Sequence, residues 1–284
     1  MSVECVAAVR ATLGEGPVWV AREQALYWVD IVERRLFRWS QGEALRTFEL
    51  GLCSLAPRAG GGFIGGGHEG FLAIAPDLTV TPLGDPEPDL PHNRFNDGKV
   101  DREGRFWAGT MDRFEREPSG KLYRLDPDLS WTQVDSGYLV TNGPAFSNDG
   151  RTMYHTDSAR RRVYAFDLAP DGTAANRRVF AEFGEADGYP DGMTVDAEDC
   201  VWIAFWDGWC VRRLSAKAER LAELRVPVQR PTSCAFGGPD LDRLFITSAR
   251  RDLTPEDLER QPDAGGLFMA VPGVSGMPEP LFAG

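Results

Sequence analysis

The feature that most constrains this chain is a repeat of forty-odd residues. Six strand-like segments each follow a polar turn and carry an aromatic residue, and consecutive aromatics lie 36 to 48 positions apart. These aromatics are Tyr27, Phe63, Trp107, Tyr154, Trp202 and Phe245. Most of the segments are followed by a second run that alternates apolar and polar residues, as half-buried strands do. The segment 253–261 is the exception, because Thr254 and Pro255 there suit the cap and the first position of a short helix.

Six all-β units of this length predict an all-β fold, a six-bladed β-propeller with roughly four strands in each blade. We expect residues 1–284 to form a single propeller domain, in which the N-terminal strand at 4–9 completes the last blade and closes the ring. An open array would leave unpaired sheet edges at both ends. A two-sheet β-sandwich is the alternative, and it has no need for such a period.

Composition excludes several classes of partner. The 284 residues carry a net charge of −12, which disfavours binding to nucleic acid or to an anionic membrane. The five cysteines are an odd number without a CxxC pair, which indicates a reducing compartment. No run approaches the roughly 20 apolar residues of a membrane helix, and residues 1–16 do not resemble a secretory signal. We therefore expect a cytoplasmic protein, and since nothing indicates an obligate interface, a monomer.

A polar residue precedes most of the strand aromatics by 11 or 12 positions. These residues are Glu15, Asn96, Asn142, Asp191 and Ser233. Equivalent positions of different propeller blades are related by rotation about the central axis. The common offset therefore predicts that these side chains converge at one end of the central channel.

Two carboxylates and two amides brought together are costly to desolvate unless a partner compensates them. No Lys or Arg occupies the equivalent positions, so a divalent cation is the simplest partner. Glu15, Asn142 and Asp191 would supply oxygen ligands and leave coordination positions open for substrate. Each residue alone could equally mark an ordinary turn. Arg94 lies two positions before Asn96, and the pair could bind substrate, although a surface salt bridge would also explain the arginine.

Several motifs together resemble the sugar lactonases of the gluconolactonase/regucalcin family. They are LGEGPVW (13–19), RFNDGKVDREGRFWAGTM (94–111), TNGPAFSNDGRTMYHTDS (141–158), YPDGMTVDAEDCVWIAFWDG (189–208) and FGGPDLDRLFITSAR (236–250) followed by AGGLF (264–268). The resemblance covers nearly the whole chain. It is strongest to bacterial members of the xylonolactonase and arabinonolactonase type.

The resemblance implies a six-bladed propeller enzyme of carbohydrate metabolism, a hydrolase that opens a sugar 1,4- or 1,5-lactone to the aldonic acid. It implies one divalent metal ion (Ca²⁺, Zn²⁺, Fe²⁺ or Mn²⁺) bound by Glu15, Asn142 and Asp191, with Asp191 also the catalytic base. It assigns substrate binding to Arg94 and Asn96. Animal members carry a further substrate-binding Glu before a Gly-x-Leu-Tyr motif, and neither Glu115 nor Glu117 aligns with it. The resemblance therefore does not identify which sugar lactone the protein prefers.

Three other functions fit a propeller. A paraoxonase-like esterase or lactonase would act on hydrophobic substrates, so a hydrophobic ester tested beside a sugar lactone separates it from a sugar lactonase. A non-catalytic divalent-metal-binding protein would bind the ion without lactone turnover. A protein-interaction propeller has no use for converging carboxylates, so Glu15 and Asp191 disfavour it.

Overall fold

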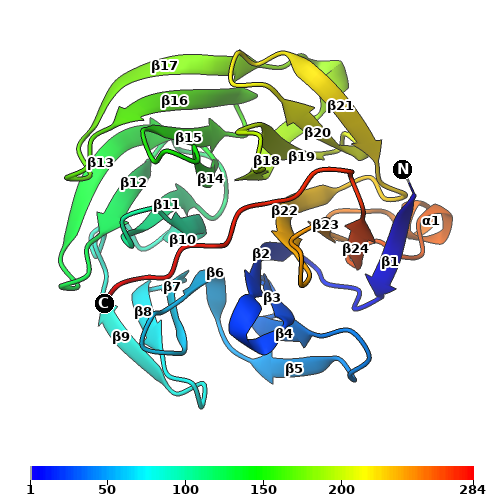
Figure 1. Ribbon diagram of the computed structural model, residues 1–284, viewed down its shortest axis with the longest axis horizontal. Coiled ribbons are helices and arrows are strands. Elements are labelled where there is room, and N and C mark those ends of the chain that lie inside the picture. Colours follow the sequence, from blue (N-terminus) through cyan, green and yellow to red (C-terminus); the bar gives the residue numbers. More distant parts are fainter. Residues whose placement is uncertain (1) are drawn as a thin grey trace. The chain divides into compact units, whose positions relative to one another are not determined.

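The computed structural model describes residues 2–284 and is almost entirely β-structure, with 24 strands (Figure 1). The strands form six four-stranded antiparallel sheets, which are the blades of a six-bladed β-propeller. The predicted fold class is therefore confirmed. The strands also gather into two compact units. Unit 1 comprises the chain up to Gly51 together with Phe183–Pro278, and unit 2 comprises Leu52–Glu182 together with Glu279–Gly284.

Unit 1 contains three sheets. One has the order β2 (Gly14–Val20), β3 (Ala25–Asp30), β4 (Arg35–Trp39) and β5 (Arg46–Glu49). The second has the order β18 (Tyr189–Val195), β19 (Val201–Trp206), β20 (Cys210–Leu214) and β21 (Arg220–Arg225). The third runs β22 (Pro231–Gly237), β23 (Arg243–Ser248), β24 (Leu267–Ala270) and β1 (Val3–Ala7). The N-terminal strand thus pairs antiparallel with the last strand of the chain.

Unit 2 contains the other three sheets, each formed by four consecutive strands. The first is β6 (Leu52–Pro57), β7 (Phe63–Gly67), β8 (Gly70–Ile74) and β9 (Val80–Gly84). The second is β10 (Asn93–Val100), β11 (Phe106–Asp112), β12 (Gly120–Leu125) and β13 (Trp131–Tyr138). The third is β14 (Thr141–Phe146), β15 (Thr152–Asp157), β16 (Arg162–Leu168) and β17 (Ala174–Glu182).

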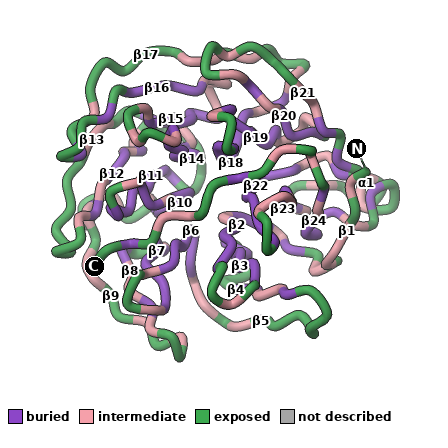
Figure 2. The backbone as a smooth tube through the Cα atoms, in the orientation of Figure 1, coloured by how far each residue is buried: buried purple, intermediate pink, exposed green. Residues whose placement is uncertain are grey.

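Burial falls across each sheet from its first strand to its last, as Figure 2 shows for β14 and β17. In unit 1, the first strands β2 and β18 both pack against β22. In unit 2, β6 and β14 both pack against β10. The strands that begin each repeat are therefore the innermost strands of each unit, as their almost continuous burial requires.

The predicted aromatics fill the cores. In unit 1, Trp202 packs in a buried cluster with Phe236 and Leu244, and in unit 2 Trp107 packs with Phe146 and Met153. The helix predicted near 253–261 is also confirmed as α1 (Pro255–Arg260), where Thr254 Oγ1 accepts a hydrogen bond from the Asp257 N–H. Among residues 2–284, no helix has the length and hydropathy that a membrane span needs.

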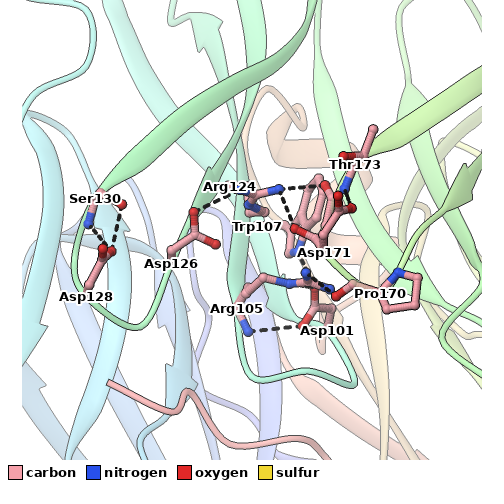
Figure 3. Close-up of polar contacts among 11 residues, drawn as sticks. Asp101, Arg105, Trp107, Arg124, Asp126, Asp128, Ser130, Pro170, Asp171 and Thr173 are labelled. Carbon is pink, nitrogen blue, oxygen red and sulfur yellow. Dashed lines mark hydrogen bonds and ion pairs between the residues drawn. The ribbon is translucent and has the colours of Figure 1, made fainter.

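The turn before Trp107 is built around one buried carboxylate (Figure 3). Asp101 Oδ2 accepts hydrogen bonds from Trp107 Nε1 at 2.7 Å and from Arg105 Nε at 2.6 Å. Arg105 also donates to the carbonyl of Pro170. The segment DREGRFW (101–107) is therefore a turn whose side-chain hydrogen bonds fix the position of Trp107 in the following strand.

Unit 1 repeats this turn at DAEDCVW (196–202). Asp196 Oδ2 accepts from Trp202 Nε1 at 2.8 Å and from Arg213 Nε at 2.7 Å. The arginine here comes from β20, because Cys200 occupies the position of Arg105. The buried aspartate at this repeated position thus pairs with an arginine in both units, but the arginine comes from the turn itself in unit 2 and from β20 in unit 1.

Candidate active site

The predicted site residues occupy matching positions on the innermost strands. Glu15 pairs with Val29 and Asn142 with Thr156, in each case two residues after the strand aromatic. Asn96 and Asp191 lie in bulges between the residues one and three positions after the aromatic. Ser233 pairs with Thr247, again two after the aromatic. The common offset in sequence is therefore a common position in the ladders.

A β-bulge follows or contains Glu15, Asn96, Asn142 and Asp191, and a glycine lies in or beside each of these bulges. Gly16 and Gly143 have φ of 55° and 77°, a left-handed conformation that glycine adopts without strain. Gly192 is required for a different reason, since a Cβ there would lie 2.2 Å from Ser233 Oγ. The Asp-Gly and Asn-Gly pairs thus bend an inner strand rather than close a hairpin.

Unit 1 supplies the two carboxylates. Glu15 on β2 and Asp191 on β18 are both buried, and their strands flank β22. The Gly16 N–H donates to Glu15 Oε2 and the Gly192 N–H donates to Asp191 Oδ1, each at 3.0 Å. A main-chain donor next to each carboxylate limits its rotation.

Unit 2 supplies an arginine and two amides that are bonded to one another. Arg94 Nη1 donates to Asn96 Oδ1 at 2.7 Å, and Asn96 Nδ2 donates to Asn142 Oδ1 at 3.0 Å. Asn142 Nδ2 in turn donates to Ser158 Oγ at 2.8 Å. This chain fixes which atom of each amide is oxygen. The structure therefore brings together three of the predicted residues, namely Arg94, Asn96 and Asn142.

Arg94 is buried and bonded within the strand, since its Nη1 also donates to the Phe95 carbonyl. The surface salt bridge considered for it is therefore wrong. Its guanidinium lies along the inner strand, beside the amide of Asn96.

Sequence reasoning passed over Asp97, which the structure places among these residues. Its Oδ2 accepts from the Gly143 N–H at 2.9 Å and its Oδ1 from the Gly98 N–H at 2.8 Å. Burial raises the pKa of Asp97 to about 6, although Lys99 and these two N–H groups oppose the shift. Asp97 thus ties β10 to the bulge that follows Asn142. The available signal was an acidic residue beside Asn96 in an otherwise buried strand.

Two further polar residues, Ser233 and His155, are buried. Ser233 is buried on β22, and its Oγ has no hydrogen-bond partner within the described chain. His155 is fully buried against Tyr138, and burial lowers its pKa to about 3. His155 is therefore a core residue.

Comparison with known proteins identifies the family. The model of the SMP-30/gluconolactonase/LRE-like region matches residues 13–250. The chain belongs to this family. It is 39% identical over 290 residues to a 6-deoxy-6-sulfogluconolactonase of Pseudomonas putida, covering 100% of this chain and 99% of that protein. It is 35% identical over 297 residues to regucalcin of Xenopus laevis, with the same coverage.

A solved structure supports the same assignment. A calcium-binding protein, regucalcin, from Agrobacterium tumefaciens superposes with a TM-score of 0.94 at 28% identity, covering 99% of this chain and 97% of that one. The SMP-30/gluconolactonase resemblance predicted from the motifs is therefore confirmed, and the chain is a hydrolase of the gluconolactonase type acting on a carboxylic ester.

Proposed function

We propose that this protein is a metal-dependent sugar lactonase that hydrolyses a 1,4- or 1,5-lactone to the aldonic acid. One observation carries the proposal: Glu15, Asn142 and Asp191 occupy matching positions on their inner strands. The similarity over the whole chain to a 6-deoxy-6-sulfogluconolactonase supports a sugar lactone as substrate.

We assign the cation to Glu15, Asn142 and Asp191. Within residues 2–284, no three His, Cys, Asp or Glu side chains are arranged so that they could hold a metal ion, so two carboxylates would need an amide oxygen to complete the set. Asn142 fits, because its Nδ2 donates to Ser158 and its Oδ1 is the acceptor atom. All three donors are oxygens, which suits Ca²⁺, Mn²⁺, Fe²⁺ or Zn²⁺. The Agrobacterium tumefaciens structure is described as a calcium-binding protein, which supports a divalent ion in general.

When bound, the cation would polarise the lactone carbonyl and offset the negative charge that develops on its oxygen. Asp191 would take a proton from the water that attacks the carbonyl carbon. The same carboxyl would return that proton to the ring oxygen as the ring carbon–oxygen bond breaks. The hydrogen bond from Gly192 to Asp191 Oδ1 holds the carboxylate for both transfers.

Arg94 and Asn96 would orient the substrate. The hydrogen bond from Arg94 Nη1 to Asn96 Oδ1 fixes the guanidinium, and Asn96 Nδ2 reaches Asn142 Oδ1 and the Thr141 carbonyl. The sugar hydroxyls or the carbonyl would therefore meet donors whose directions are already set, which lowers the entropic cost of alignment.

We place this activity in the cytoplasm and expect a monomer. None of the five cysteines forms a disulfide within residues 2–284, which agrees with a reducing compartment. The net charge of −12 disfavours nucleic acid as a partner.

A pH-indicator assay tests the proposal. Chelator-treated protein would be assayed on a panel of sugar lactones, with a hydrophobic lactone and an aryl ester for comparison, and single metals would be added back. We expect sugar lactone opening only with metal. Full activity without metal contradicts the cation assignment. Metal binding without turnover indicates a binding protein, and preference for the hydrophobic substrates indicates a paraoxonase-like esterase.

A further inference from the structure

The loop that follows β11 presents an aromatic ring covered by cations. Phe114 is 49% exposed, and the guanidinium carbons of Arg113 and Arg116 lie 4.9 Å and 4.6 Å from its ring centroid. The His92 ring meets the same phenyl group edge-on at 5.4 Å. Such contacts hold an arginine by the face of its guanidinium, and its N–H donors point outward in the plane of the group.

The backbone of the loop is anchored, so the positions from which these arginines project are fixed. Buried Asp112 accepts hydrogen bonds from the N–H groups of Phe114 and Arg116, each at 3.1 Å. At the other end, Ser119 Oγ donates to Asn93 Oδ1 at 2.7 Å, and Asn93 Nδ2 donates to Glu87 Oε2 at 2.8 Å. The loop is thereby fastened to the first residue of β10.

The strand register places this loop next to Arg94. Arg94 pairs with Met111, and the Arg113 N–H donates to the His92 carbonyl at 3.0 Å, which continues the ladder beyond β10 and β11. Alternate residues of a strand share a face, so Arg113 lies on the face of Arg94. Diagonal neighbours in such a ladder have Cβ atoms about 7 Å apart. The side chains of Arg113 and Arg94 therefore leave the backbone on the same face of the sheet.

The donor geometry of the loop favours oxyanions over neutral groups. Sulfonate and phosphate present several oxygens that match the N–H fork of arginine. The side chain of Arg116 is 64% exposed even though Asp112 lies 3.9 Å away. Glu115 and Glu117 share the loop, so recognition would depend on the aimed donors rather than on net positive charge.

We propose that Arg113 and Arg116, held on the ring of Phe114, form a subsite for an anionic substituent of the sugar lactone, of the sulfonate or phosphate type, remote from the reacting carbonyl. The inference rests on the proposed lactonase function and names its substrate class. Arg94 and Asn96 would bind the part of the sugar nearer the reaction, and the loop would bind the far end.

The test compares three lactones: glucono-1,5-lactone, its 6-phosphate and its 6-deoxy-6-sulfonate. For the unaltered protein we expect kcat/KM at least about tenfold higher for one of the anionic lactones than for the neutral one, a difference typical of one well-placed charged contact. In Arg113→Gln and Arg116→Gln, that ratio should fall at least about fivefold, mainly through KM. Arg178→Gln is the matched control, because Arg178 is an exposed arginine paired with Asp167 on the same unit.

The result identifies the anion, since preference for the phosphate or for the sulfonate supports the subsite and tells them apart. Equal kcat/KM for neutral and anionic lactones would overturn it while the lactonase proposal stood. A ratio unchanged in both variants would overturn it as well. Failure to open any of the three lactones with any metal would instead contradict the proposed function, and the subsite with it. Circular dichroism of each variant verifies folding.

Discussion

The two units bring different chemistry to the same strand position. In unit 1, Glu15 and Asp191 are carboxylates, each with a hydrogen bond from the N–H of the glycine that follows it. In unit 2, Asn96 and Asn142 are amides joined to each other and to Arg94. The carboxylates of unit 1 provide negative charge, and the hydrogen-bonded amides of unit 2 provide polar groups with a fixed orientation. A repeated fold can thus keep a backbone position constant while its repeats carry different side-chain chemistry there.

Asp97 sharpens this comparison, because it is a buried carboxylate on an inner strand of unit 2. Both of its oxygens accept main-chain N–H groups, one of them from the neighbouring inner strand. We therefore interpret it as a structural acid, whereas Asp191 is the proposed reacting one. Substitution of each of the two aspartates by asparagine distinguishes these roles.

The largest effect is expected for Asp191→Asn, which keeps the shape of the side chain and removes its basicity. A general base typically contributes about 10² to 10⁴ in rate, so kcat should fall about a thousandfold with metal saturating. The measurement is the pH-indicator assay on a sugar lactone. Asp240→Asn, an exposed aspartate of the same unit, is the control. Retention of full activity by Asp191→Asn would show that this carboxylate is not the base.

Asp97→Asn should change the pH dependence of stability. The folded pKa of about 6 exceeds the ordinary 3.8, so the folded state binds the proton more tightly and this residue favours folding below pH 4. That contribution, about 3 kcal/mol, is lost as pH rises from about 4 to 6 and is absent above. Urea unfolding of metal-free protein across this range should show the loss in the unaltered chain and not in the variant.

Parallel pH profiles in the two proteins would contradict this interpretation of Asp97. The same variant should keep its metal affinity within about threefold, because Asp97 is not a proposed ligand. A large loss of metal binding would instead move Asp97 into the ligand set.

Asn96→Ala tests the amide chain. It removes the donor to Asn142 Oδ1 and the acceptor of Arg94, so the proposed ligand loses its fixed orientation. Loss of such outer partners typically weakens metal binding by about 10- to 100-fold. Calorimetric titration of the metal measures the change, with Asn148→Ala, a hairpin asparagine of the same unit, as control. Unaltered affinity would mean that Asn142 is oriented without its neighbour.

Arg94→Lys is expected to have the smallest effect of the four. The charge stays, but lysine lacks the planar fork and would not reproduce the bond to Asn96 Oδ1 together with substrate contacts. We expect kcat/KM to fall about fivefold, mostly through KM. Steady-state kinetics on the preferred lactone measures it. A fall in kcat with KM constant would assign Arg94 to the chemical step instead.

The sequence predicted the fold and the strand positions well, because period and offset are local properties of a repeat. Glu15 and Asn142 both pair with the residue two positions after the strand aromatic, because the hairpins that follow them have the same length. The short helix was readable from Thr254 and Pro255 for the same local reason.

What the sequence did not show depends on contacts between strands far apart in the chain. In the sequence, Asp97 and Gly98 resemble an ordinary Asp-Gly turn. The hydrogen bond that Asp97 accepts from the Gly143 N–H joins residues 46 positions apart. The burial of Arg94 was equally unreadable, since an arginine in a strand is more often exposed. The meeting of Glu15, Asn142 and Asp191 around a cation stays a prediction, as does a single domain spanning residues 1–284.

The pairing of β1 with β24 has a consequence for synthesis of the chain. Residues 52–182 of unit 2 are contiguous, and their three sheets can form as soon as that stretch leaves the ribosome. Unit 1 combines segments that precede and follow this stretch, and Val3 cannot pair with Ala270 until residue 270 has been translated. During synthesis, β1 therefore stays without its partner strand until β24 has been made.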